Sequence, residues 1–234
     1  MKKTVIITGG TSGYGLATAK AFKEKGYTVL ITGRNLERLE KAQKETGADY
    51  IFVQDVKEYA TWKALKEFAI EKMGGVDVLV NNAGGGVAIQ PIEKQGKEII
   101  DDTIALNLAS VMYAANVFVP DMKERKAGTI INVSSVCAKH AWADWSVYAA
   151  TKAGVLNFTK GLHVELQPYG VRAVCIIPAS ASTGFQSACG IGGTQDSLQT
   201  EDIANAILYA AEMPNRAVVE EMTVWGMSQI VQPL

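Results

Sequence analysis

The sequence predicts an α/β fold, a doubly wound parallel sheet contained in a single domain. Two observations predict it. Short runs rich in Val and Ile alternate with longer amphipathic segments, and a glycine-rich turn follows the first run. The chain has 234 residues with no shift in composition and no repeat, a normal length for one α/β domain. We therefore expect one domain spanning residues 1–234.

The strands are expected where near-continuous apolar runs end in small or polar residues. The candidate strands are Thr4–Thr8, Thr28–Thr32, Tyr50–Val53, Val76–Val80, Thr129–Val133, Val171–Ile177 and Met222–Trp225. Amphipathic segments between them predict helices near Gly15–Glu24, Leu36–Glu45, Tyr59–Met73, Lys97–Met122, Ser146–Leu166 and Thr200–Glu212. Such apolar runs are typical of strands with helices on both faces. Strands separated by helices pair in parallel through right-handed crossovers.

The longest apolar stretch, Ile104–Val119, is shorter than the roughly 20 residues of a membrane span. Asn107, Ser110 and Asn116 interrupt it, and Pro120 ends it. The apolar run at the N-terminus is also too short for the core of a secretory signal. We interpret the stretch as a buried helix, with a subunit contact as one place for it, and we expect a soluble, cytoplasmic protein.

Composition and charge argue against several classes of protein. The net charge is −1, without the basic excess that is typical of nucleic-acid binding. The three cysteines, Cys137, Cys175 and Cys189, form no C-x-x-C pair, and their odd number argues against a disulfide framework or a zinc site. We expect no metal, no nucleic acid and no membrane partner.

Two features mark the region before the last helix. The segment 179–199 is rich in Gly, Ser, Ala and Thr. An irregular segment of this length in a compact domain is usually functional, so we expect it to be the substrate loop. The following helix begins with Thr200 and then Asp202, a capping pair whose acid falls one residue early for the strict spacing.

The turn after the first strand carries glycines at positions 9, 13 and 15. A pyrophosphate must approach this backbone closely, and a Cβ would block it. The next helix would direct its free N–H groups and positive dipole end at the phosphates. Because the turn lies between a strand and a helix, it favours a Rossmann-type dinucleotide site over a purely structural turn.

The end of the second strand indicates which dinucleotide binds. An NAD site usually carries an acidic residue there for the ribose 2′-hydroxyl. This chain has Gly33 and then Arg34, and a guanidinium can pair with a 2′-phosphate through two hydrogen bonds. The sequence therefore favours NADP(H). The alternative is that Arg34 is a solvated residue at a helix start.

A second pattern, Tyr148 and Lys152, places a phenol and an ammonium on one helix face. A nearby cation favours the phenolate, so such a tyrosine can exchange a proton with an alcohol near neutral pH. A strand ends shortly upstream in Ser134 and Ser135, and another strand, far earlier in the sequence, ends in Asn81–Gly84. Ligands bind at the carboxyl ends of strands in open α/β sheets, so these segments are expected near one site.

These motifs resemble those of the short-chain dehydrogenase/reductase family, in its compact single-domain branch, over nearly the whole chain. The matching motifs are Thr8–Gly15, Asp55-Val56, Asn81–Gly84, Asn107, Ser135, Tyr148 and Lys152. The resemblance implies an NADP(H)-dependent oxidoreductase that interconverts a carbonyl and a secondary alcohol by hydride transfer.

The resemblance also implies a role for each residue. Tyr148 would be the general acid/base, and Lys152 would assist it and hold the nicotinamide ribose. Ser135 would polarise the substrate carbonyl, and Asn107 would hold a water that links Lys152 to solvent. Asp55 would contact the adenine. The residues expected to contact the cofactor are Gly9, Thr11, Ser12, Gly13, Tyr14, Gly15, Arg34, Asn35, Asp55, Val56, Asn82, Ala83, Gly84, Tyr148, Lys152, Pro178 and Thr183.

One position departs from the family pattern. Pro178 is followed by Ala179 where the family usually has a glycine, while Thr183 is retained. The resemblance implies that Thr183 contacts the nicotinamide amide. We expect the alanine to shift the start of the loop slightly without abolishing cofactor binding.

Four bulky side chains are candidates for a substrate wall. His140, Trp142 and Trp145 lie between the catalytic serine and tyrosine, and Phe185 begins the long loop. An apolar or aromatic substrate face is one interpretation of the tryptophans, and ordinary core or subunit packing is the other.

Substrate and assembly stay open at this stage. The substrate could be a ketone, a hydroxysteroid or a short hydroxy acid, and residues 220–234 loosely resemble members that act on small 3-hydroxy acids. The family usually forms dimers or tetramers, so we expect a homo-oligomer. A non-catalytic NADP(H)-binding regulator is the rival interpretation, although such proteins usually lose the Tyr or Lys. An epimerase or dehydratase of the extended branch would need a larger C-terminal domain.

Overall fold

A seven-stranded parallel sheet forms the centre of the protein. The structure is a computed structural model that describes residues 2–86, 88–180 and 198–227. The strands are β1 (Thr4–Thr8), β2 (Thr28–Gly33), β3 (Tyr50–Val53), β4 (Val78–Asn81), β5 (Gly128–Val133), β6 (Val171–Pro178) and β7 (Glu221–Val224). Their order is β3-β2-β1-β4-β5-β6-β7, and every pairing is parallel. Thr183, Phe185 and Cys189, with most of the expected substrate loop, lie outside the described residues.

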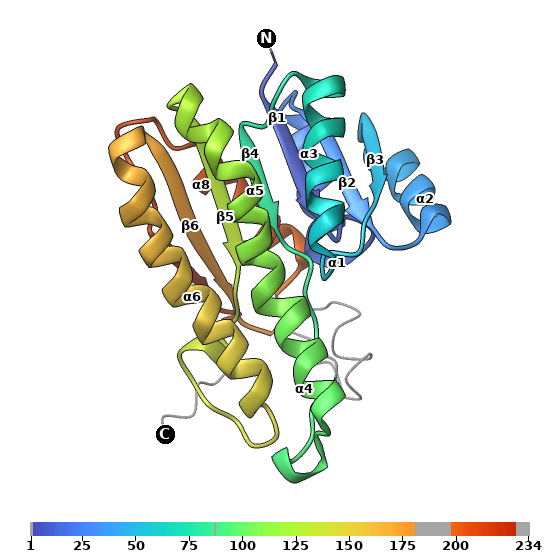
Figure 1. Cartoon of the computed structure of the whole chain (residues 1–234), viewed down its shortest axis with the longest axis vertical. Coiled ribbons are helices and arrows are strands. Elements are labelled where there is room, and N and C mark those ends of the chain that lie inside the picture. Colours follow the sequence, from blue (N-terminus) through green and yellow to red (C-terminus); the bar gives the residue numbers. More distant parts are fainter. Residues whose placement is uncertain (1, 87, 181–197, 228–234) are drawn as a thin grey trace.

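Helices cover both faces of this sheet (Figure 1). The longer helices are α1 (Gly13–Glu24), α2 (Leu36–Thr46), α3 (Tyr59–Met73), α4 (Lys97–Ile104), α5 (Ser110–Arg125), α6 (Ser146–Leu166) and α8 (Thr200–Glu212). Short turns are η1 (Ile92–Lys94), η2 (Ala105–Ala109), η3 (Val136–Ala138) and η4 (Gln167–Tyr169). One core lies under α1, α2 and α8, and the other under α3, α5 and α6. The predicted doubly wound fold is confirmed.

Alternate residues of β1 face opposite cores, as the pleat of a strand requires. Val5 and Ile7 belong to the same core as Phe22 of α1. Ile6 belongs to the other core, with Trp62 of α3. All five residues of β1 are buried, which is why the strand is apolar throughout rather than alternating.

The strand order reverses at β1, and this reversal positions the site. The chain runs outward from β1 through β2 to β3 and then returns to β4 on the other side of β1. Connections that leave a parallel sheet in opposite directions open a crevice at the carboxyl ends of the two strands, where ligands of such folds bind. The glycine turn follows β1 and the Asn81–Gly84 segment follows β4, so both border this crevice.

The expected helix from Lys97 to Met122 is a continuous helical stretch with a π-helical turn, η2, in its middle. The expected helix included Pro120, and α5 does run through Pro120, ending at Arg125 rather than at Met122. Proline removes one backbone hydrogen bond from a helix, and here the flanking turns persist. Single π-turns of this kind are frequently found at functional sites, and Asn107 is the central residue of η2.

Residues Lys97–Arg125 are long and apolar enough to cross a membrane by length and composition alone. Core helices of soluble proteins pass the same test. This stretch packs against α3, α6 and β5, and 44% of its most apolar window is buried. We therefore assign it to the core of the fold.

The start of α8 corrects one detail of the expected cap. The N-cap residue is Gln199, not Thr200, and its side chain accepts a hydrogen bond from the backbone of Asp202. In return the backbone N–H of Gln199 donates to the Asp202 carboxylate at 2.9 Å. With the cap moved by one residue, the acid falls at the usual capping-box position.

Candidate functional site

The glycine turn between β1 and α1 is tight and closely packed. Gly9 and Gly13 adopt left-handed φ angles of 66° and 53°, which glycine tolerates at little cost. A Cβ on Gly15 would lie 2.2 Å from the carbonyl oxygen of Gly9, so nothing larger than glycine fits there. Ser12, the N-cap residue of α1, makes no side-chain cap hydrogen bond, which leaves the first helical N–H groups to an anion. The turn therefore fits a pyrophosphate.

Asn82 joins this turn to the end of β4. Its side-chain amide donates to the carbonyl oxygens of Thr8 and Gly9, at 2.9 and 3.3 Å. The Thr8 hydroxyl accepts from the backbone N–H groups of Asn82 and Ala83, both at 3.0 Å. In the structure the side chain of Asn82, an expected cofactor contact, thus fixes the crevice between β1 and β4.

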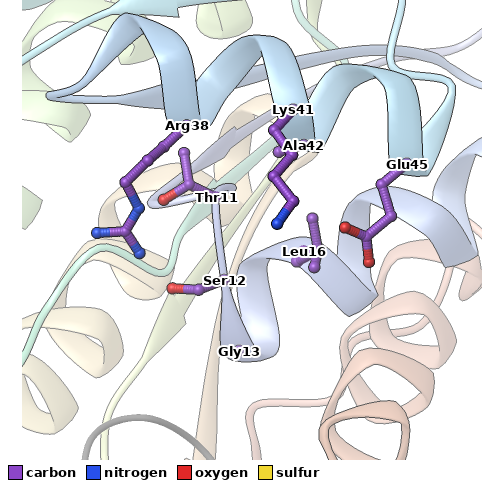
Figure 2. A pocket seen from close by; sticks show the side chains of 8 residues that line it. All are labelled: Thr11, Ser12, Gly13, Leu16, Arg38, Lys41, Ala42 and Glu45. Atoms are coloured by element: carbon purple, nitrogen blue, oxygen red, sulfur yellow. The ribbon is translucent and has the colours of Figure 1, made fainter.

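A cavity of about 350 Å³ lies between the turn and α2 (Figure 2). It is lined by Thr11, Ser12, Gly13, Leu16, Arg38, Lys41, Ala42 and Glu45. Arg38 and Lys41 extend from α2 toward the turn. Two cations beside two hydroxyl groups form a set of donors that suits a phosphate group. Arg34 is exposed at the end of β2 and is not among the residues that line the cavity.

The sequence reasoning missed Arg38 and Lys41. A signal was present, because Arg38, Lys41 and Glu45 follow a helical spacing of three and four residues, which places them along one side of α2. The expected site stopped at Arg34 and Asn35, since only the residues immediately after β2 were considered.

Other expected cofactor residues have identifiable local roles. The Asn35 side chain caps α2 by accepting from the Arg38 backbone N–H at 2.9 Å. The Asp55 carboxylate accepts from the N–H two residues later at 3.0 Å, and Val56 is buried. Tyr14 packs partly buried against the core beneath α1, and burial raises the pKa of its hydroxyl.

Tyr148 and Lys152 lie one turn apart on α6, and both are buried. The Lys152 ammonium is 5.7 Å from the centre of the Tyr148 ring and donates to the carbonyl oxygen of Val133 at 3.0 Å. Burial lowers the pKa of Lys152 to about 8. A cation that is desolvated in this way interacts more strongly with a nearby phenol than an exposed lysine would.

Asn107 connects η2 to the segment after β4. Its amide nitrogen donates to the carbonyl oxygens of Gly85 and Thr103, at 2.8 and 3.1 Å, and its amide oxygen accepts from the Gly85 N–H at 3.0 Å. A Cβ on Gly84 would lie 2.9 Å from the Asn107 amide oxygen and 3.2 Å from Lys152 Nζ. The structure thus brings Gly84, Asn107 and Lys152 together, although they are far apart in the sequence.

The serines at the end of β5 have different partners. The Ser135 hydroxyl accepts from the Cys137 N–H at 3.2 Å, so its own hydrogen can point to a ligand. The Ser134 hydroxyl donates to the Lys152 carbonyl oxygen at 2.8 Å. Ser134 therefore fixes β5 to α6, a role that the sequence reasoning did not assign.

Ala179 fits where the family usually has glycine. Its N–H donates to the Val224 carbonyl oxygen at 2.9 Å, which extends the ladder between β6 and β7. Ala179 is not among the described residues with a positive φ angle, so its Cβ causes no backbone strain. Pro178 pairs with Val224 at the end of β6, and Thr183 lies outside the described residues.

The described part of the chain holds no cluster of three or more His, Cys, Asp or Glu side chains that could bind a metal ion. Cys137 and Cys175 are buried as free thiols. The polar groups at this edge of the sheet are instead a phenol, an ammonium, an amide and hydroxyl groups. Together with the glycine cradle, they can bind a dinucleotide and exchange a proton with a ligand oxygen.

Comparison with known proteins places this architecture in a family. The family model for short chain dehydrogenases matches residues 3–190. An oxidoreductase of Staphylococcus haemolyticus strain JCSC1435 is 32% identical over 224 residues, which cover 95% of this chain and 96% of that one. An oxidoreductase of Staphylococcus aureus strain USA300 is also 32% identical over the same lengths. The chain belongs to the short-chain dehydrogenase/reductase family.

A solved structure gives the same result. The closed form of serine dehydrogenase complexed with NADP⁺ superposes with a TM-score of 0.92 at 28% identity, covering 99% of this chain and 98% of that one. With the family established, the chain is an oxidoreductase of this class, as its motifs predicted.

Proposed function

We propose that this protein is an NADP(H)-dependent carbonyl reductase and secondary alcohol dehydrogenase. The observation that carries the proposal is the convergence of Tyr148, Lys152 and Asn107 beside the glycine cradle, with Ser135 at the end of the neighbouring strand. When bound, the nicotinamide supplies or accepts the hydride. The protein supplies binding, orientation and the proton.

In the reducing direction, the Tyr148 hydroxyl donates its proton to the substrate oxygen as that oxygen becomes an alkoxide. Ser135 donates a hydrogen bond to the same oxygen and stabilises the developing negative charge. Lys152, held by Val133, keeps a positive charge near the phenol and so stabilises the phenolate that remains. In the oxidising direction the phenolate takes the proton back.

Asn107 would fix the backbone next to the Lys152 ammonium, on the side away from the substrate oxygen. Its amide fixes the backbone of Gly85 and leaves Gly84 next to the Lys152 ammonium. A water in the π-turn region would link Lys152 to solvent and restore the proton to Tyr148, as the family resemblance implies.

Cofactor choice is proposed to favour NADP(H) because of the charges beside the glycine turn. Arg38 and Lys41 line the cavity, and a third cation, Arg34, is exposed immediately after β2. The end of β2 carries no acidic residue that would repel a 2′-phosphate. Similar solved structures, among them the serine dehydrogenase, are complexes with NADP⁺.

The substrate is proposed to be a small carbonyl or alcohol compound, and the protein a cytoplasmic homo-oligomer, a dimer or tetramer. Apolar side chains exposed on the long helices support the assembly, among them Ile104, Met112 and Val164. Size-exclusion chromatography with light scattering would give the number of subunits.

The activity is tested by mixing the protein with NADPH, or with NADH, and a panel of ketones, and following the loss of reduced-nicotinamide absorbance. The proposal expects turnover with NADPH, and Tyr148→Phe should lose it while still binding NADPH. Tight NADPH binding without turnover of any ketone would instead favour a non-catalytic regulator.

A further inference from the structure

An aromatic wall follows Ser135 in the structure. It consists of His140, Trp142, Trp145 and Trp225, and so contains three of the chain's four tryptophans. The His140 ring lies 5.6 Å from the ring of Trp225, edge to face at 75°, and 6.1 Å from the ring of Trp142. Separations of this size are typical of attractive aromatic contacts. The His140 ring thus contacts aromatic rings from two segments that are far apart in the sequence.

The wall reaches the catalytic tyrosine. The ring of Trp145 lies 5.5 Å from the ring of Tyr148, edge to face at 71°. At the other end, Trp142 remains 40% exposed. The partly exposed Trp145 beside the catalytic tyrosine and the exposed Trp142 of the same segment offer a surface for an apolar ligand.

Polar contacts hold the wall in place. The Lys139 ammonium donates to the Glu221 carboxylate and the Thr223 hydroxyl of β7, at 2.5 and 3.2 Å. The His140 N–H donates to the Val136 carbonyl oxygen at 2.9 Å, in the turn that follows Ser135. A surface that is fixed before the ligand arrives loses less conformational entropy on binding.

The charges nearby argue against a carboxylate substrate. Lys139 is paired with Glu221, and Lys152 donates to Val133. Asp144, in the turn between Trp142 and Trp145, adds a negative charge to the wall. A keto acid or a hydroxy acid would therefore meet aromatic rings and a carboxylate rather than a cation that is free to pair with it.

We propose that the aromatic wall selects aryl ketones, compounds in which a phenyl ring is attached next to the carbonyl carbon. The inference rests on the proposed function. The phenyl ring packs against Trp142 and Trp145 while the carbonyl oxygen meets Tyr148 and Ser135. Aromatic pairs attract each other beyond the effect of the area that they bury.

The test compares acetophenone with cyclohexyl methyl ketone, which have rings of similar size, and with 3-oxobutanoate. The expected kcat/KM for acetophenone exceeds that for the cyclohexyl ketone by roughly two- to tenfold. The Trp142→Leu variant should bring this ratio close to one, and Trp142→Phe should keep most of it. Tyr169→Leu, which changes an exposed aromatic residue in η4, should leave the ratio unchanged.

A binding measurement separates the two proposals. Isothermal titration calorimetry in the presence of NADP⁺ compares 1-phenylethanol with 1-cyclohexylethanol and needs no turnover. Preferential binding of the phenyl compound, lost in Trp142→Leu, supports the wall even if no ketone is reduced, an outcome that would count against the proposed function alone. Equal binding of the two alcohols, a ratio unaffected by Trp142→Leu, or a preference for 3-oxobutanoate would overturn the inference.

Discussion

The ammonium of Lys152 lies 3.0 Å from the carbonyl oxygen of Val133, the last residue of β5. This hydrogen bond holds a cation in the interior of the protein, one helical turn from Tyr148. Taking the cation out of water lowers the pKa of Lys152 to about 8. Burying the charged ammonium therefore lowers the free energy of unfolding, although the proposed proton transfer needs that charge beside Tyr148.

This penalty predicts how stability depends on pH. The unfolded chain keeps the Lys152 proton up to a pH of about 10.4, whereas the folded chain releases it near 8. Between these values the unfolded state binds more protons, so the free energy of unfolding should rise with pH, by up to about 3 kcal/mol. Below pH 8 the penalty is fully present. Urea unfolding at pH 7.5 and at pH 10 measures this rise in the free energy of unfolding. The wild type should show the rise, and the Lys152→Met variant should lack it. The same pH dependence in both proteins would show that this lysine is not the source.

Gly84 and Gly85 offer a matched pair of substitutions. A Cβ on Gly84 would press on Asn107 and Lys152, while a Cβ on Gly85 would meet nothing within 4 Å. We expect Gly84→Ala to lower the free energy of unfolding by about 1–3 kcal/mol and Gly85→Ala to change it by less than about 0.5 kcal/mol. Urea unfolding measures both. Equal effects of the two substitutions would mean that the space around Gly84 is not restricted.

The cavity beside the glycine turn predicts a cofactor effect that depends on charge. Arg38→Gln and Lys41→Gln should each weaken NADPH binding by roughly tenfold or more, because a charge-assisted hydrogen bond contributes about 1.5–3 kcal/mol. NADH binding should change little. Lys44→Gln, on the same helix but not lining the cavity, is the control. Arg34→Gln shows how much the arginine expected from the sequence contributes to NADPH binding. Titration of the nicotinamide fluorescence gives the dissociation constants. Equal losses for NADPH and NADH would place the 2′-phosphate elsewhere.

The hydroxyl of Ser135 should matter for rate more than for binding. Ser135→Ala removes one hydrogen bond to the reacting oxygen, which typically costs about 10²–10³ in kcat, while NADPH binding should be retained. Ser135→Thr keeps a hydroxyl and should keep more activity than the alanine variant. Steady-state kinetics with the best ketone of the panel checks this order, and an alanine variant as active as the wild type would exclude the role.

Much of the fold could be predicted from the sequence, because strands buried on both faces are apolar throughout. β1 and β3 have the predicted bounds, and the glycine turn follows β1 as expected. The first and last residues of strands were less predictable where hydrogen bonding with a neighbouring strand determines them. β7 begins at Glu221 rather than Met222, since pairing with β6 and not apolar character fixes its start. The end of α5 at Arg125 rather than Met122 was likewise not revealed by apolar periodicity.

The candidate site was predictable where a motif carries the chemistry. Tyr148 and Lys152 are neighbours because a helix places residues four apart on one face. The contacts among Gly84, Asn107 and Lys152 depend on the sheet order and on a π-turn, and neither follows from local spacing. The role of Ser134 was missed for the same reason, since it comes from the packing of α6 on β5. The helical spacing of Arg38 and Lys41 was visible in the sequence, but the packing of α2 beside the glycine turn was not.

The central claim is that this site moves a hydride from NADPH to a carbonyl carbon while Tyr148 supplies the proton. The most direct measurement uses NADPH deuterated at the transferable position and acetophenone, with the alcohol product analysed by mass spectrometry. The account predicts 1-phenylethanol with one deuterium on the carbinol carbon from the wild type, and little or no product from Tyr148→Phe. Alcohol without that deuterium, or undiminished labelled product from the variant, would contradict it.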